Sequence, residues 1–350
     1  MRALIFVAVY YAIFAYPWLR VSGQLDLRIF SGPLALAVLL CAPAVGWILS
    51  RRIEPPGRYW VARSVYVWSG VSWIAFALSV PWELVYLLTP IPTTTAASLW
   101  IVVLAILTAW AVFNGNRLTV RAVPVPLRGL ERPIRAVQLS DVHVGSRSPA
   151  FLQRVVTRTA ALDPDVVFIT GDLVDGHGVS GQQLSALASL PSPVCFAIGN
   201  HERYVDCDAI CARLESHGII VLRNHTTEVL VADSRLTVTG IDDADDPAAI
   251  AKTLPSLPDA GRGCSVLLYH RPDGLEDAAS HGIDLMLSGH THNGQLVPFN
   301  ALVRRRFPRI QGVYTSGSTV LHVSSGTGTW GPAMRLGSAN EITLLELAPA

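Results

Sequence analysis

The chain has 350 residues, of which 51% are hydrophobic and only 15% are charged. An average soluble domain carries about 25% charged residues, so this composition predicts that part of the chain lies in lipid. The formal net charge of +1 gives no support for a nucleic-acid partner. The five cysteines are an odd number without zinc-ribbon spacing, and we expect Cys207 and Cys211, one helical turn apart, to be reduced thiols of the core rather than ligands or a bridge.

The apolar excess lies in the first 115 residues. Four apolar stretches there are close to the ~17–25 residues that a helix needs to cross the hydrocarbon core. They are Ala3–Trp18, Ile29–Ser50, Val65–Trp82 and Ala96–Phe113. The sequence therefore predicts a four-helix transmembrane region over residues 1–115. For the first stretch, which is short, a signal sequence is the alternative interpretation; we favour a retained helix because no clear cleavage site follows it.

The arginines around these stretches predict the orientation of the chain. The second loop and the segment after the fourth stretch are rich in arginine, whereas the first loop has few and the third has no basic residue. The arginines of the two rich segments are Arg51, Arg52, Arg58, Arg63, Arg117, Arg121, Arg128, Arg132 and Arg135. Because positive loops stay in the cytoplasm, we expect an inner-membrane protein with both termini and the polar half on the cytoplasmic side. Glu83 is interpreted as a marker of the outer interface, with a buried functional carboxylate as the alternative.

A basic, proline-rich segment joins the two halves of the chain. Residues 121–133 read "RAVPVPLRGLERP", which is typical of an extended linker. We expect residues 116–133 to be this linker. It either contacts anionic headgroups through its arginines or only fixes the topology.

From residue 134 to residue 350 the pattern changes to an α/β domain. Short runs rich in β-branched residues predict strands at Ile134–Leu139, Val166–Thr170, Val194–Ile198, Leu236–Ile241, Ser265–Leu268, Leu285–Leu287, Thr319–Val323 and Ile342–Leu347. Helix-like segments between them are Pro149–Leu162, Gln182–Leu190, Asp206–His217 and Gly274–His281. This alternation predicts a layered α/β core.

Five of the predicted strands run directly into side chains that bind metals. In chain order these donors are Asp141, His143, Asp172, Asn200, His201, His270, His290 and His292. Strand ends at one edge of an open α/β sheet converge on a crevice, so we expect the donors to meet there. Oxygen donors mixed with several imidazoles suit Mn, Fe or Zn, and eight donors exceed the needs of one ion. The pattern therefore predicts two divalent metal ions, with Mn favoured.

The motifs that carry these donors resemble those of the calcineurin-like metallophosphoesterase family. The chain contains "DVH", "GDLVD", "GNHE", "YH" and "GHTH" in this order. "GHTHNGQ" and the tail "GTGTWGPAMRLGSANEI" are similar to the membrane-associated bacterial branch. The resemblance covers roughly residues 133–347, and it implies a four-layer α/β/β/α domain that hydrolyses phosphoesters.

The resemblance also implies a role for each donor. One ion would be held by Asp141, His143 and His292, and the second by Asn200, His270 and His290, with Asp172 bridging both. His201 would face the scissile phosphate and stabilise the leaving group. Family members often carry aspartate at the position of Glu202, which leaves the role of this residue open.

Together these features predict a membrane-anchored phosphohydrolase at the cytoplasmic leaflet. One substrate class is a lipid-linked phosphate or pyrophosphate, such as UDP-diacylglucosamine, and the other is a soluble nucleotide. Candidate substrate contacts are Arg203, Tyr204 and Arg335. A protein partner cannot be inferred from the sequence. The alternative function is a non-enzymatic, metal-binding membrane scaffold or sensor.

Overall fold

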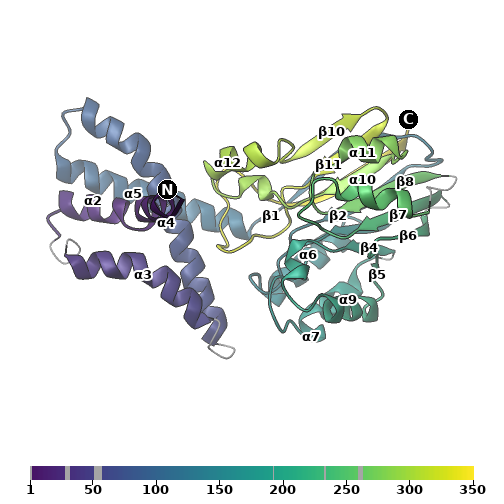
Figure 1. Cartoon of the computed structure of the whole chain (residues 1–350), viewed down its shortest axis with the longest axis horizontal. Coiled ribbons are helices and arrows are strands. Elements are labelled where there is room, and N and C mark those ends of the chain that lie inside the picture. The colour runs from purple at the N-terminus through teal and green to yellow at the C-terminus, as the bar shows by residue number, and fades with distance from the viewer. Residues whose placement is uncertain (1, 28–31, 51–56, 192, 232–233, 259–262) are drawn as a thin grey trace. The chain divides into compact units, whose positions relative to one another are not determined.

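The computed structural model describes residues 2–27, 32–50, 57–191, 193–231, 234–258 and 263–350. The chain divides into a helical unit and an α/β unit, which are described separately (Figure 1). The helical unit contains residues 1–116 together with two short segments, 296–298 and 331–337. All other residues belong to the α/β unit. The unit boundary at Asn116 lies one residue after the predicted end of the transmembrane region.

The helical unit is built from apolar helices. They are α1 (Arg2–Phe14), α2 (Tyr16–Gln24), α3 (Pro33–Ser50), α4 (Gly57–Leu88) and α5 (Thr93–Asn116). Among the described residues, two helices are long and apolar enough to cross a membrane, Trp60–Leu88 and Thr93–Asn116. A third span results if α1 and α2, which are bent by 45°, act as one. The apolar part of α3, Pro33–Gly46, is shorter. Arg51 and Arg52, on which the predicted orientation partly rests, lie outside the described residues.

A polar contact joins two helices of this unit. The guanidinium of Arg20 in α2 donates to both carboxylate oxygens of Glu83 in α4, at 2.9 and 3.1 Å. The hydroxyl of Tyr16 also donates to Glu83, at 2.8 Å. Both carboxylate oxygens of Glu83 are therefore hydrogen-bonded within the helical unit.

Two segments that were predicted to lie in the domain of residues 134–350 belong instead to the helical unit. The indole Nε1 of Trp73 in α4 donates to the carbonyl of Val297 at 3.3 Å. Met334 is completely buried in a cluster with Trp100 of α5 and with Leu296. Apolar packing against the helices places these segments in this unit, which local sequence patterns do not reveal.

The α/β unit contains two six-stranded sheets packed face to face. The first has the order β1-β12-β2-β3-β4-β5 and the second β10-β11-β9-β8-β7-β6. The strands of the first sheet are β1 (Leu118–Leu127), β12 (Asn340–Pro349), β2 (Ile134–Leu139), β3 (Val166–Thr170), β4 (Val194–Ala197) and β5 (Ile220–Val221). Those of the second are β10 (Gly312–Ser316), β11 (Thr319–Val323), β9 (Leu285–Ser288), β8 (Cys264–Tyr269), β7 (Ser234–Ile241) and β6 (His225–Val231).

Side-chain alternation along the strands fills three apolar layers. In β3, Val166 and Phe168 point into the core between the two sheets, whereas Val167 and Ile169 point into the core beneath the outer helices. This is the two-residue period of an extended strand, and burial of both faces explains why β3 is almost wholly apolar. A third core lies on the outer face of the second sheet.

Helices cover the outer faces of both sheets, which completes the predicted α/β/β/α order of layers. The first sheet is covered by α6 (Pro149–Ala160), α7 (Gly181–Leu184) and α9 (Cys207–Ser216), and the second by α10 (Ala249–Thr253) and α11 (Leu275–Ser280) (Figure 1). The remaining helices are α8 (Asn200–Arg203), α12 (Phe299–Arg306) and the 3-10 turns η2 (Ser185–Ser189), η3 (Leu254–Ser256) and η4 (His292–Gly294).

The segment predicted to be a linker, residues 116–133, contains a strand of the domain. Leu118–Leu127 forms β1, which pairs in parallel with β12 along ten residue positions. Pro124 and Pro126 are compatible with β1 because it is an edge strand. A proline has no N–H to donate, and an edge strand tolerates this where its backbone faces away from the neighbouring strand. The expectation of extended backbone was correct, but that of a linker was wrong.

Candidate metal centre

The eight predicted donors follow five parallel strands, three in the first sheet and two in the second. Strands β2, β3 and β4 are parallel neighbours, and so are β8 and β9. Their carboxyl ends lie at one edge of the two-sheet core, where the loops that follow them meet. The donors are largely buried, and His290 and His201 are the more exposed of them.

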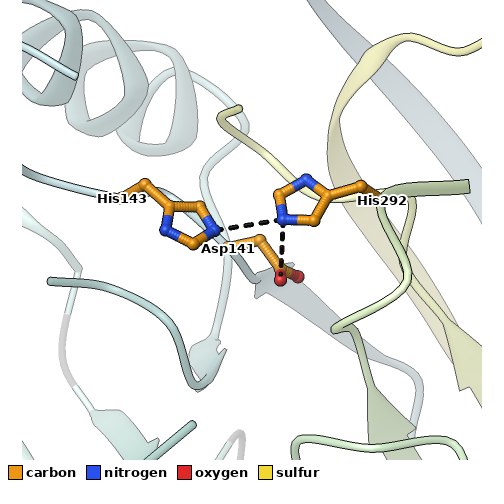
Figure 2. A group of neighbouring side chains, drawn as sticks. All are labelled: Asp141, His143 and His292. Atoms are coloured by element: carbon orange, nitrogen blue, oxygen red, sulfur yellow. Dashed lines mark hydrogen bonds and ion pairs between the residues drawn. The ribbon is translucent and has the colours of Figure 1, made fainter. Parts of the chain in front are cut away.

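One group of donors consists of Asp141, His143 and His292. The Nε2 atoms of the two histidines lie 3.0 Å apart, and Nε2 of His292 lies 3.3 Å from Oδ1 of Asp141. Figure 2 shows the two rings and the carboxylate directed at one point. This is one set of side chains whose ligand atoms are close enough to hold a single ion.

A second group consists of Asp172, His270 and His290. Nε2 of His270 lies 3.2 Å from Oδ2 of Asp172. The ring of His290 contacts the predicted donor Asn200, with Nδ1 2.9 Å from the amide oxygen. The four side chains expected around a second ion are therefore together.

Asp172 lies between the two groups. Its Oδ2 atom is 3.9 Å from Nε2 of His143 in the first group and 3.2 Å from Nε2 of His270 in the second. Burial opposes ionisation of this carboxyl, but the nearby charge of His270 holds the pKa of Asp172 well below its usual range. An ionised carboxylate placed between two groups of donors suits a bridging ligand.

The backbone of the donor loops is unusual. Asp141, His143, Asp172, His290 and His292 all have positive φ angles, between 49° and 70°. Left-handed backbone is uncommon for residues other than glycine and concentrates at functional sites, where the surrounding structure enforces it. The sharp turn at each strand end is what directs these side chains inward.

Glycine is required beside two of the donors because other atoms occupy the space of a side chain. A Cβ on Gly289 would overlap Ser140 and the carboxylate of Asp141, and a Cβ on Gly199 would overlap the carboxylate of Asp172. The close approach of these loops to the neighbouring carboxylates therefore depends on the absence of a side chain at both glycines.

Glu202 binds the backbone of the loop that carries Asp172. Its side chain is completely buried and accepts hydrogen bonds from the backbone N–H groups of Asp172, Val174 and Gly199, at 2.8–2.9 Å. Burial, reinforced by the charge of Asp172, raises the pKa of Glu202 to about 7. The residue that departs from the family pattern thus joins the β3 and β4 loops.

Asp175 is a further residue of the site. Its carboxylate lies 3.2 Å from Nδ1 of His143 and accepts hydrogen bonds from the N–H and hydroxyl of Ser146. A carboxylate on the far nitrogen of a metal-binding histidine fixes the orientation of the ring. The only signal in the sequence was its position three residues after Asp172.

His201 lies at the open side of the donors. Its Nε2 atom is 4.0 Å from Oδ2 of Asp172, and its side chain is 18% exposed. Burial lowers the pKa of His201, against the opposing charge of Asp172. Two exposed aromatic rings flank the imidazole edge-on: that of Tyr204 at 5.6 Å and that of Trp330 at 6.2 Å. Trp330 lies in the tail motif, but we did not predict it as a site residue.

The two candidate arginines have different surroundings. Arg203 donates to the buried carboxylate of Asp243 at 2.9 Å, and the neighbouring Arg271 donates to the same carboxylate at 2.7 Å. Arg203 remains partly exposed beside His201 and Tyr204 in the chain. Arg335 is completely buried and belongs to the helical unit, so the structure does not place it relative to the donors.

The chemistry of the donor set fits divalent metal ions. Nδ1 of His270 lies 2.7 Å from the carbonyl of Thr170, and because a carbonyl only accepts, Nδ1 carries a hydrogen. The other nitrogen, Nε2, is buried and has no hydrogen-bond partner among the described residues. Buried polar atoms are normally satisfied, so a buried ring nitrogen without a hydrogen-bond partner, 3.2 Å from the Asp172 carboxylate, is what a metal site requires.

Comparison with known proteins agrees with this arrangement. Residues 134–294 match the family model described as calcineurin-like phosphoesterase. A metallophosphoesterase of Campylobacter jejuni is 32% identical over 264 residues, which cover 71% of this chain and 68% of that protein. One from Helicobacter pylori is 32% identical, over 66% of this chain and 64% of its own length. A zebrafish (Danio rerio) transmembrane protein with metallophosphoesterase domain is 35% identical, over 66% and 56%. The matches to the second and third relatives thus span less than two thirds of those proteins.

Proposed function

Because the chain belongs to the calcineurin-like phosphoesterase family, we propose that it is a membrane-anchored phosphohydrolase that uses two divalent metal ions, with Mn favoured over Fe or Zn. The observation that carries this proposal is that six buried or half-buried donors form two adjacent groups, with Asn200 against His290 and with His201 beside them. Its reaction is the hydrolysis of a phosphoester or pyrophosphate bond.

Each donor has one assigned task in this proposal. Asp141, His143 and His292 would hold one ion, Asn200, His270 and His290 would hold the second, and Asp172 would be shared between the two groups. When bound, two such ions supply Lewis-acid stabilisation of phosphate oxygens and a water of lowered pKa. Asp175 and Glu202 keep the His143 ring and the Asp172 loop in place through the contacts described above.

His201 acts on the leaving oxygen. Burial favours its neutral form in the free protein, and an anionic phosphate placed beside the ring favours the protonated form. The imidazolium then donates its proton from Nε2 to the departing oxygen, or offsets the negative charge that develops there. Arg203 and Tyr204, which follow in the same loop, contact the non-reacting part of the substrate.

The substrate is proposed to be lipid-linked. The apolar helices hold the domain at the inner membrane, and the arginine distribution favours the cytoplasmic side for it. An active site fixed at a membrane surface suits an amphiphile such as UDP-diacylglucosamine. A soluble nucleotide is the competing substrate class.

The experiment is a comparison of substrates with the purified, Mn-loaded full chain in detergent. A lipid-linked pyrophosphate, a phosphatidyl ester, a nucleotide and a generic bis-aryl phosphate are offered side by side, with His201→Ala and Asp172→Ala as controls. Preference for a lipid substrate that both variants lose supports the proposal. If only soluble esters are hydrolysed, the proposal of a lipid-linked substrate is wrong. If the protein binds two metal ions but hydrolyses none of the substrates, the non-enzymatic scaffold is favoured.

A further inference from the structure

Helix α12 (Phe299–Arg306) carries exposed apolar side chains. None of its eight residues is buried, and Phe299 and Leu302 are 44% and 50% exposed. These two residues are three positions apart, so they lie on the same side of the helix. Removing a phenylalanine and a leucine on one side of a helix from water is favourable, so this side is suited to contact with an apolar environment.

The same helix ends in a run of positive charge. Arg304, Arg305 and Arg306 occupy its last turn, and it contains no acidic residue. Arg306 lies 3.4 Å from Asp273, whereas Arg304 and Arg305 are exposed and make no ion pair with any residue that the structure describes. Apolar residues next to uncompensated arginines are the combination by which interfacial helices bind anionic lipids.

The chain attaches α12 to the helical unit at one end and to the metal centre at the other. Phe299 directly follows Pro298, the last residue of a segment that packs with the apolar helices through the Trp73 contact. Immediately after α12, Phe307 is buried, and its ring lies edge-on to that of His290 at 5.0 Å.

We propose that α12 is an interfacial helix that docks on the anionic lipid surface of the membrane in which the apolar helices lie. Phe299 and Leu302 enter the boundary between headgroups and acyl chains, and Arg304 and Arg305 pair with lipid phosphates. Phe307, which directly follows the docked helix, connects it to His290 of the metal centre through their ring contact. This inference rests on the proposed membrane anchoring and deepens the proposed lipid substrate class, but it does not depend on the hydrolytic reaction.

The test uses the full chain in nanodiscs with an environment-sensitive fluorophore at Leu302→Cys. Cys41, an exposed native cysteine, is replaced by serine, and protein without the new cysteine gives the background labelling. The matched control is Leu230→Cys on β6, an equally large side chain that is 71% exposed. Quenching by lipids with a nitroxide on the acyl chain is compared between phosphatidylglycerol-containing and pure phosphatidylcholine discs.

We expect quenching at position 302 to exceed that at position 230 by at least about twofold in anionic discs. Adding Arg304→Glu and Arg305→Glu should return it to the control level. Equal quenching at the two positions overturns the inference. So does quenching at position 302 that changes neither with the lipid charge nor with the two arginine-to-glutamate substitutions. Hydrolysis of a bis-aryl phosphate by the same samples separates the two proposals, since this soluble ester does not need α12 to dock.

Discussion

At the scale of single residues, the geometry of the centre depends on a carboxylate that accepts hydrogen bonds from the backbone of the donor loops. Glu202 accepts three buried N–H groups, so Glu202→Ala leaves all three without a partner. Each such loss costs about 1–3 kcal/mol, and we expect the free energy of unfolding of the variant to fall by at least about 3 kcal/mol. Denaturant unfolding of the metal-free protein measures this. A change below about 1 kcal/mol would show that water replaces the carboxylate.

A second residue-scale prediction concerns protons and metal. Burial lowers the pKa of His270, but the nearby charge of Asp172 outweighs it and raises the pKa to about 10. In the metal-free protein this ring is therefore protonated below about pH 10 and must lose a proton to bind an ion, so affinity rises with pH. We expect the metal Kd to fall by about tenfold per pH unit for each proton released. Calorimetric titration in buffers of different ionisation enthalpy counts these protons, and a Kd independent of pH between about 6 and 9 would contradict the assignment of His270.

At the scale of elements, the turns after the strands determine the geometry of the centre. Gly289 follows β9, and a Cβ there would overlap Ser140 and Asp141. We expect Gly289→Ala to reduce bound metal and lower the turnover of a bis-aryl phosphate by more than about tenfold. Gly181 is the matched control because a Cβ added there would meet no atom within 4 Å and its φ is not positive. Gly181→Ala should retain metal and turnover; equal behaviour of the two variants would refute the steric argument.

The sequence predicts the central elements of the domain better than its edges. Ile134–Leu139, Val166–Thr170 and Thr319–Val323 occur as strands with the predicted bounds, because burial on both faces makes such strands largely apolar. Edge strands carry a weaker signal. In β1 exposed residues alternate with buried ones and two prolines interrupt the run, and β6 is polar over its first half.

The clustering of the predicted donors could be expected from the sequence, but the residues that support them could not. Asp141 and His292 stand in short motifs directly after strands, whereas Asp175 is identified only by its contact with His143. Such a contact joins the β2 and β3 loops, and it depends on the tertiary arrangement rather than on spacing along the chain. The positive φ angles of the donors are likewise a property of the folded loops.

At the scale of the whole molecule, the helical unit includes residues that follow strands of the α/β unit in the chain. Leu296 and Met334 are buried in the same cluster as Trp100 and other residues of the apolar helices. A chain shortened to residues 117–350 exposes both side chains, and each loses about 1.5–3 kcal/mol of apolar burial. We expect this shortened chain to aggregate without detergent, and Leu296→Ser with Met334→Ser to increase the monomeric fraction. Size-exclusion chromatography measures both; a monodisperse shortened chain would refute this dependence.

The central claim is that two metal ions and His201 act together on a phosphoester. The most direct test measures bound metal by mass spectrometry and turnover of a bis-aryl phosphate in three forms of the full chain: wild type, His201→Ala and Asp172→Asn. The account predicts two ions per chain in wild type and in His201→Ala, with turnover reduced about 100-fold or more in the latter, and fewer than two ions in Asp172→Asn. Unchanged turnover of His201→Ala, or full metal content without the Asp172 carboxylate, would contradict it.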